Sequence, residues 1–199
     1  APGVIYCISA GIRVLTAPGD GVLILEPVYF PFRSTILANK RVPVISSLRN
    51  NNGHWEIDFD DLDRKLGMAK AILFCSPHNP VGRVWSEEEL GRVAKLAEKH
   101  GVGVICDEIH SDFIFEGRHI PFASIDGMAE RTIVVNGFSK SYAMTGWRLG
   151  WAMGPKEIMR HVCKIHQFGI MSAPTTAQFA GIEAIRTGDD DIARMRDQY

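Results

Sequence analysis

Val102-Gly103-Val104-Ile105-Cys106-Asp107 is the stretch that decides the fold, because a short apolar run leads directly into a carboxylate. A continuous run of this kind is typical of a β-strand buried on both faces, as in parallel sheets. The run therefore predicts a strand followed directly by Asp107. Further strands are predicted at Val22–Leu25, Val42–Ile45, Ala71–Cys75, Thr132–Val135 and Leu149–Met153.

Helical patterns alternate with these strands. Ser86 and Glu89 form a capping box that opens a helix ending near His100. Apolar residues recur at helical spacing from Val4 to Leu15. Other helices are expected at Phe32–Asn39, Asp58–Leu66, Pro155–Phe168 and Thr175–Thr187. Strands that alternate with helices predict an α/β fold, with a mostly parallel sheet covered by helices on both faces.

The composition is that of an ordinary globular protein. Of the 199 residues, 46% are hydrophobic and 23% are charged, and the net charge is −1. This balance argues against binding to nucleic acid or to a membrane surface through bulk charge. The four cysteines, Cys7, Cys75, Cys106 and Cys163, show no CxxC spacing, so we expect reduced thiols and a cytoplasmic location.

Both ends of the chain look cut. The sequence opens on Ala1-Pro2-Gly3, directly before a helical pattern and without an initiator methionine. It closes within Asp191–Tyr199, which resembles a helix that has just begun. We therefore expect a fragment of a longer protein.

Polar residues follow three of the predicted strands, in the loops Ser76–Val84, Asp107–His110 and Gly137–Lys140. Ligands bind outside the carboxyl ends of strands in open α/β sheets. Lys140 stands between Phe138 and Tyr142, which suggests a buried amine, although a lone lysine is usually a solvated surface charge. A buried amine loses its proton more easily and can form a Schiff base with a carbonyl, for which pyridoxal phosphate is a common partner.

Residues suited to the ring of that cofactor lie nearby in the predicted sheet. Asp107 could pair with the ring nitrogen, or it could simply cap a turn. Asn79 and His110 could donate to the phenolic oxygen, although a Pro/Gly turn and a structural histidine are the plainer interpretations. Tyr29 could stack on the ring or could pack in the core.

Residues suited to a phosphate are also present. Val4 and Ile5 begin the first helix, whose free amides favour an anion. Ser139 offers a hydroxyl and Arg148 a cationic fork. Dinucleotide-binding glycines and metal-ligand spacings are absent, so no metal is expected.

The segment from Ser139 to Arg148 resembles the lysine segment of class I and II aminotransferases, which are pyridoxal phosphate enzymes of fold type I. The resemblance covers the whole chain and implies that residues 1–199 are part of the large cofactor-binding domain, without the amino-terminal arm and the small domain. It implies that Lys140 carries the cofactor as an internal aldimine. It also implies that Asn79, Asp107, Ser139 and Arg148 contact the cofactor, with Tyr29 against the ring.

A second resemblance concerns the branch of the family. The segments 76–85 and 107–112 are similar to those of cystathionine β-lyases of the MalY/PatB type, and His110 stands where most aminotransferases have a tyrosine. The segment 164–176 looks like that of ordinary aminotransferases. Gly137 and Ile5 replace hydroxyl-bearing residues of many relatives, which implies a phosphate site that depends more on amides and Arg148.

These features predict an aminotransferase that acts on an L-amino acid and is a homodimer in its full-length form. A carbon–sulfur β-lyase is the alternative, because the first steps of both reactions use the same residues. A non-catalytic effector-binding domain is a third interpretation. We expect residues 1–199 alone to be inactive, since the resemblance implies that the substrate carboxylate binds outside them.

Overall fold

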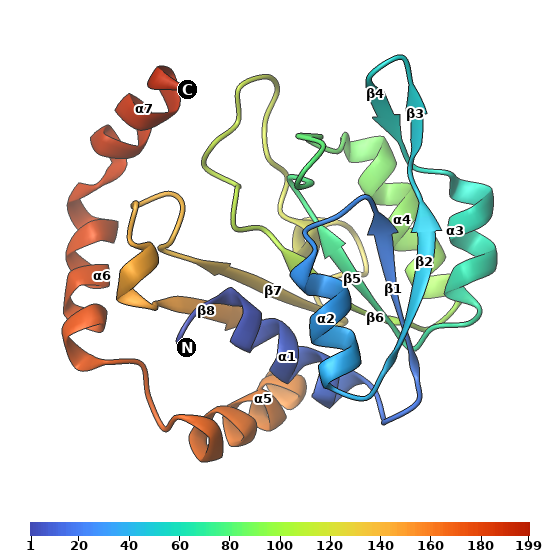
Figure 1. The fold of residues 1–199 in the computed structure, drawn as a ribbon, viewed down its shortest axis with the longest axis horizontal. Coiled ribbons are helices and arrows are strands. Elements are labelled where there is room, and N and C mark those ends of the chain that lie inside the picture. The colour runs from blue at the N-terminus through green and yellow to red at the C-terminus, as the bar shows by residue number, and fades with distance from the viewer.

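A computed structural model describes residues 1–199 and contains a six-stranded sheet with the order β2-β1-β5-β6-β7-β8 (Figure 1). Neighbouring strands are parallel except for β8, which pairs antiparallel with β7 at one edge. The sheet strands are β1 (Gly21–Glu26), β2 (Val42–Ser47), β5 (Ala71–Cys75), β6 (Gly103–Asp107), β7 (Thr132–Gly137) and β8 (Gly150–Met153). This architecture confirms the α/β fold with a mostly parallel sheet.

The chain forms seven α-helices. They are α1 (Val4–Leu15), α2 (Pro31–Ala38), α3 (Phe59–Leu66), α4 (Glu87–Lys99), α5 (Lys156–Gly169), α6 (Thr175–Thr187) and α7 (Asp189–Gln198). The capping box of α4 is confirmed, because the Ser86 hydroxyl accepts from the Glu89 amide at 3.2 Å while the Glu89 carboxylate accepts from the Ser86 amide at 2.8 Å. Two short 3₁₀ helices, η1 (Phe122–Ser124) and η2 (Thr145–Trp147), complete the set.

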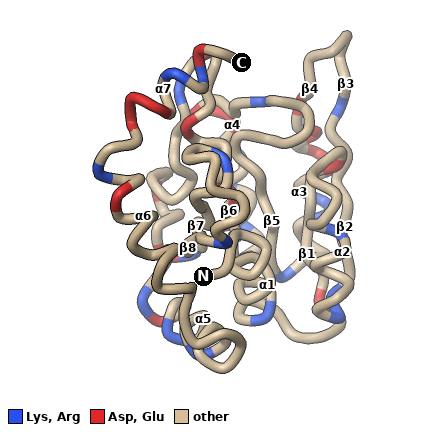
Figure 2. Tube along the Cα trace, turned by 60° about the vertical axis from the view of Figure 1, so that its left-hand side comes forward, with Lys and Arg blue, Asp and Glu red and all other residues tan.

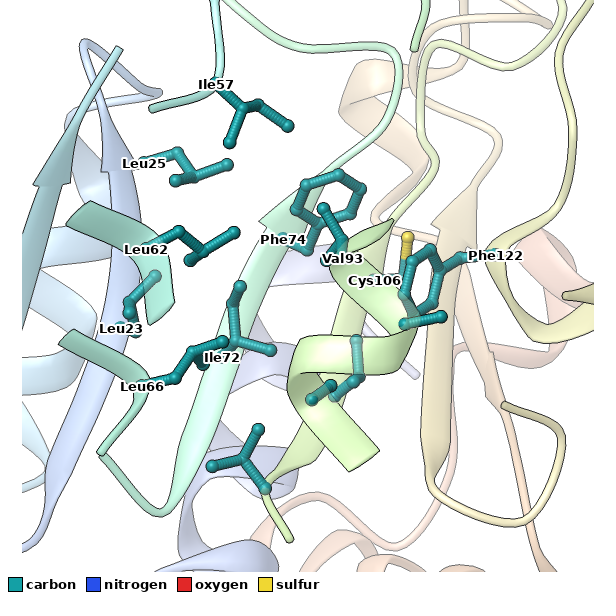
Figure 3. Close-up of a cluster of buried hydrophobic side chains, with 14 of the residues drawn as sticks. Leu23, Leu25, Ile57, Leu62, Leu66, Ile72, Phe74, Val93, Cys106 and Phe122 are labelled. Carbon is teal, nitrogen blue, oxygen red and sulfur yellow. The ribbon is translucent and has the colours of Figure 1, made fainter. Parts of the chain in front are cut away.

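Helices cover both faces of the sheet because side chains of the buried strands alternate between two cores. On one face, Leu23 of β1 and Ile72 of β5 pack against α3 and α4 through Leu62 and Val93 (Figure 3). On the other face, Ile24 of β1 and its neighbours pack against α1, α2 and α5. Burying both faces explains why these strands are continuously apolar.

Two contacts close the structure around the sheet edge. The Gly150 amide of β8 donates to the carbonyl of Ala1 at 2.9 Å, so the start of α1 lies against β8. Helix α6 packs on the same edge through Ala177, against Phe138 and Leu149. Helix α6 leaves three large apolar side chains exposed, namely Phe179, Ile182 and Ile185.

One small element was not predicted, an antiparallel hairpin of β3 (Arg49–Asn51) and β4 (His54–Glu56). Its turn contains Asn52 and Gly53, both with positive φ. No helix of the chain combines the length and apolar character that a membrane-spanning helix needs. Basic and acidic residues are interspersed along the chain (Figure 2).

Candidate active site

A cavity of about 160 Å³ lies between the amino-terminal end of α1 and loops that follow β1, β5, β6 and β7. The structure brings every predicted site residue to its wall. The lining residues are Val4, Ile5, Tyr29, Cys75, Asn79, Asp107, Ile109, His110, Ser139, Lys140, Thr145 and Arg148. Residues more than 140 positions apart in the sequence therefore share one site.

Asp107 is the last residue of β6 and is only 4% exposed. One carboxylate oxygen accepts from the Ile109 amide at 3.1 Å, so the turn-capping interpretation is realised. The other oxygen makes no hydrogen bond within the protein. Burial raises the pKa of the Asp107 carboxyl to about 7, against the opposing effects of the Ile109 amide and the Lys140 charge. The cavity wall thus holds a carboxylate that a cationic partner would stabilise.

Lys140 is exposed, so the expectation of a buried amine is wrong. Its aromatic neighbours point elsewhere, because Phe138 and Tyr142 pack on one another with ring centres 5.2 Å apart, in the cluster beneath α6. Lys140 still lines the cavity with Asp107, and its charge acts on the pKa of both Asp107 and His110.

Asn79 and His110 lie at one side of the cavity, and neither side chain forms a hydrogen bond within the protein. Burial lowers the pKa of His110, and the Lys140 charge lowers it further, so a neutral imidazole is favoured. A neutral imidazole offers one donor and one acceptor. Tyr29 is 37% exposed and contacts Phe32 edge-on, with ring centres 5.9 Å apart.

The opposite side of the cavity is suited to an anion. Helix α1 begins after Gly3 with no side-chain cap and no acidic residue in its first turn, so its first amides remain free. The Arg148 guanidinium lies beside them, since a Cβ atom on Gly3 would come within 2.8 Å of Arg148 Nη2. Arg148 Nη1 also donates to the Thr145 carbonyl at 2.7 Å. A fixed cation beside free helix amides is a phosphate-binding arrangement.

Packing explains why a glycine stands at position 137, where many relatives have a hydroxyl-bearing residue. A Cβ atom there would lie 3.0 Å from both the Gly150 Cα atom and the Leu149 carbonyl oxygen. The close approach of β7 and β8 therefore favours glycine, and the hydroxyl of a serine is absent from this part of the site.

The site fits pyridoxal phosphate in four respects. The unpaired oxygen of the buried Asp107 carboxylate suits the ring nitrogen. The Asn79 and His110 side chains, which form no hydrogen bonds within the protein, suit the phenolic oxygen. The α1 amides and Arg148 suit the phosphate. Lys140 supplies the amine.

The whole chain, residues 1–199, matches the family described as aminotransferase class I and II, and the chain belongs to that family. Two similar curated proteins come from Bacillus subtilis. YugH is 38% identical over 197 residues, covering 99% of this chain and 51% of YugH. Cystathionine beta-lyase PatB is 38% identical over 164 residues, covering 80% of this chain and 42% of PatB.

A solved structure agrees with this assignment. The N-succinyldiaminopimelate aminotransferase from Mycobacterium tuberculosis superposes with a TM-score of 0.94 and is 33% identical, covering 98% of this chain and 52% of that one. Other solved structures with matching folds contain pyridoxal 5′-phosphate. The resemblance to both aminotransferases and the PatB type is thus confirmed, and the chain spans about half the length of the curated relatives it matches.

Three lining residues were not predicted. Thr145 lies within the lysine segment, and its hydroxyl donates to the Ser139 carbonyl at 2.8 Å, so its position five residues after Lys140 was an available signal. Cys75 and Ile109 line the wall through their positions at a strand end and a turn. Their apolar character gave no signal.

Proposed function

We propose that the full-length protein is a pyridoxal phosphate-dependent aminotransferase that acts on an L-amino acid. The observation that carries this proposal is a single cavity that joins the Lys140 amine and the buried Asp107 carboxylate to an anion-binding arrangement, which consists of the free α1 amides and the Arg148 guanidinium. Family membership and the cofactor found in similar structures support it.

Pyridoxal phosphate, when bound, supplies an electron sink for the bond that breaks at Cα of the amino acid. Asp107 is suited to hold the ring nitrogen protonated, which strengthens that sink. Asn79 and His110 would fix the phenolic oxygen, while Ser139, Arg148 and the α1 amides would hold the phosphate. We propose Tyr29 as the side chain that packs against the ring.

Lys140 has two proposed tasks. Its amine holds the cofactor covalently before the amino acid arrives, and the freed amine then removes the Cα proton as a general base. In transamination, Lys140 would also be placed to return that proton, before water releases the keto acid product and a second keto acid accepts the amino group. Because Lys140 lines the same cavity as Asp107 and His110, one side chain can serve both steps.

A carbon–sulfur β-lyase is the second candidate, and the 38% identity to PatB favours it. In that reaction Lys140 would remove the same Cα proton, and a sulfur leaving group would depart from Cβ. The cavity supports both outcomes equally, whereas the segment around Lys140 favours transamination.

The test uses the full-length protein with added pyridoxal phosphate. The wild type should develop a visible absorption band, Lys140→Ala should lose it, and Lys95→Ala, which alters an exposed lysine on α4, should keep it. Equal spectra for Lys140→Ala and wild type would remove the lysine assignment. Transfer between an amino acid and a keto acid is expected; pyruvate and a free thiol from cystathionine would favour the lyase instead.

We further infer that residues 1–199 form part of the large domain of a cytoplasmic homodimer. The exposed side chains Phe179, Ile182 and Ile185 on α6 are available for a contact between subunits. Light scattering on the full-length protein should give twice the subunit mass, and a monomer would contradict the inference. Cell fractionation tests the location.

A further inference from the structure

The loop that carries His110 and the turn that carries Lys140 are joined by side chains outside the cavity wall. The Ser141 hydroxyl, directly after Lys140, donates to an Asp112 carboxylate oxygen at 2.5 Å. The Asn136 side-chain amide donates from Nδ2 to the Ser111 hydroxyl at 3.1 Å. These two hydrogen bonds connect residues 25 to 29 positions apart in the sequence.

The turn needs such an attachment. Ala143 has a φ of 52°, in the left-handed region that is unfavourable for alanine. Within the turn, the Ala143 amide donates to the Lys140 carbonyl at 3.0 Å, and the Met144 amide donates to the Phe138 carbonyl at 3.1 Å. The Lys140 side chain itself is exposed and forms no hydrogen bond with the protein. Contacts of its neighbours must therefore fix the position of its amine.

Ser141 is the neighbour best placed to do so, because it is 1% exposed and its hydroxyl bonds to a charged acceptor. Hydrogen bonds to ionised acceptors are about twice as strong as neutral ones. Asp112 lies two residues after His110 and does not line the cavity that holds Lys140. Its hydrogen bond to Ser141 links it instead to the Lys140 turn.

We propose that Asp112 is a positioning residue. Through its hydrogen bond with the buried Ser141 hydroxyl, it holds the Lys140 turn in the position that lets the Lys140 amine bind the cofactor. The proposal rests on the proposed function, since it assigns Lys140 to the cofactor. A fixed turn keeps the effective concentration of the amine at the cofactor carbonyl high. A loosened turn spreads the amine over a larger volume and weakens cofactor retention.

The experiment compares variants of the full-length protein in complex with pyridoxal phosphate. Asp112→Ala and Ser141→Ala should each raise the cofactor dissociation constant about tenfold, which equals about 1.4 kcal/mol. Asp112→Asn keeps an oxygen that can accept from Ser141 and should stay within about threefold of wild type. The double alanine variant should be no weaker than the weaker single variant, because both changes remove one interaction.

Controls and a second measurement separate positioning from a general loss of stability. Asp126 and Ser124 are exposed and do not line the cavity that holds Lys140. The Asp126→Ala and Ser124→Ala variants should therefore bind the cofactor as wild type does. Borohydride reduction followed by peptide mass spectrometry should find less cofactor attached to Lys140 in Asp112→Ala than in wild type. Should Asp112→Ala fail to fold, Ser141→Ala carries the same test.

Unchanged cofactor affinity in Asp112→Ala and Ser141→Ala would overturn the proposal, as would additive losses in the double variant. A lower melting temperature with normal attachment at Lys140 would also overturn it, because Asp112 would then be structural only. Failure of the proposed function is recognised separately, since wild type and Lys140→Ala would then bind the cofactor equally.

Discussion

Replacing Asp107 with asparagine should stabilise the cofactor-free protein while it impairs the cofactor-bound one. The side chain is 4% exposed, and burial raises the pKa of its carboxyl from 3.8 to about 7. Folding therefore disfavours the ionised form. Asparagine has almost the same shape, carries no charge and can still accept the hydrogen bond from the Ile109 amide.

The sign and size of the effect follow from proton linkage. Because the folded protein holds the Asp107 proton more tightly than the unfolded chain, stability present below about pH 4 is lost as the pH rises through about 7. A pKa rise from 3.8 to about 7 corresponds to about 4 kcal/mol above pH 7. About 2 kcal/mol of this loss should develop between pH 5 and pH 7.

Urea unfolding of the cofactor-free, full-length protein, followed by circular dichroism, measures this effect. The stability advantage of Asp107→Asn over wild type should grow as the pH rises from 5 to 8, and taking the difference removes the contributions of other titrating groups. Saturating cofactor should reverse the order of the two proteins, because wild-type Asp107 then pairs with a cation. A difference that is constant with pH would refute the reasoning.

Two further predictions concern the phosphate side and the core. Gly3→Ala should weaken cofactor binding severalfold in a spectroscopic titration, because the new Cβ atom would meet Arg148 Nη2 at 2.8 Å. Gly19 also has a positive φ but has open space around it, so Gly19→Ala should lower stability and leave the cofactor affinity unchanged. Leu62→Ala should lower the free energy of unfolding by about 2–5 kcal/mol in urea unfolding, because this leucine of α3 is fully buried against the sheet. Leu37 is half-exposed, so Leu37→Ala should change the free energy of unfolding by less than about 0.5 kcal/mol.

The sheet and its order of elements could be predicted because burial on two faces imposes a local signal. Ala71–Cys75 is apolar at every position, and both of its faces are covered by helices in the structure. The capping box at Ser86 could also be predicted, because it depends on two residues only three positions apart in the sequence. Most site residues came together because they follow a strand or begin a helix, whereas Arg148 stands just before β8.

Other features depend on side-chain direction or on distant contacts, and the sequence carries little signal for them. The aromatic residues beside Lys140 suggested burial, yet their rings face the cluster beneath α6. The hairpin at 49–56 is mostly exposed, so no apolar pattern marked it, although Asn52-Gly53 is a favourable turn pair. The bond between Ser141 and Asp112 spans 29 positions and has no local pattern.

The pairing of Gly150 with Ala1 has a consequence for biosynthesis. While the ribosome is still translating residues before 150, the start of α1 lacks its β8 partner and Arg148 has not yet emerged. The phosphate site is therefore incomplete until the segment around residue 150 has been made, and its formation requires closing a chain loop of about 150 residues, which is entropically costly and slow. Nascent chains that stall before residue 148 would lack the arginine side of the phosphate site.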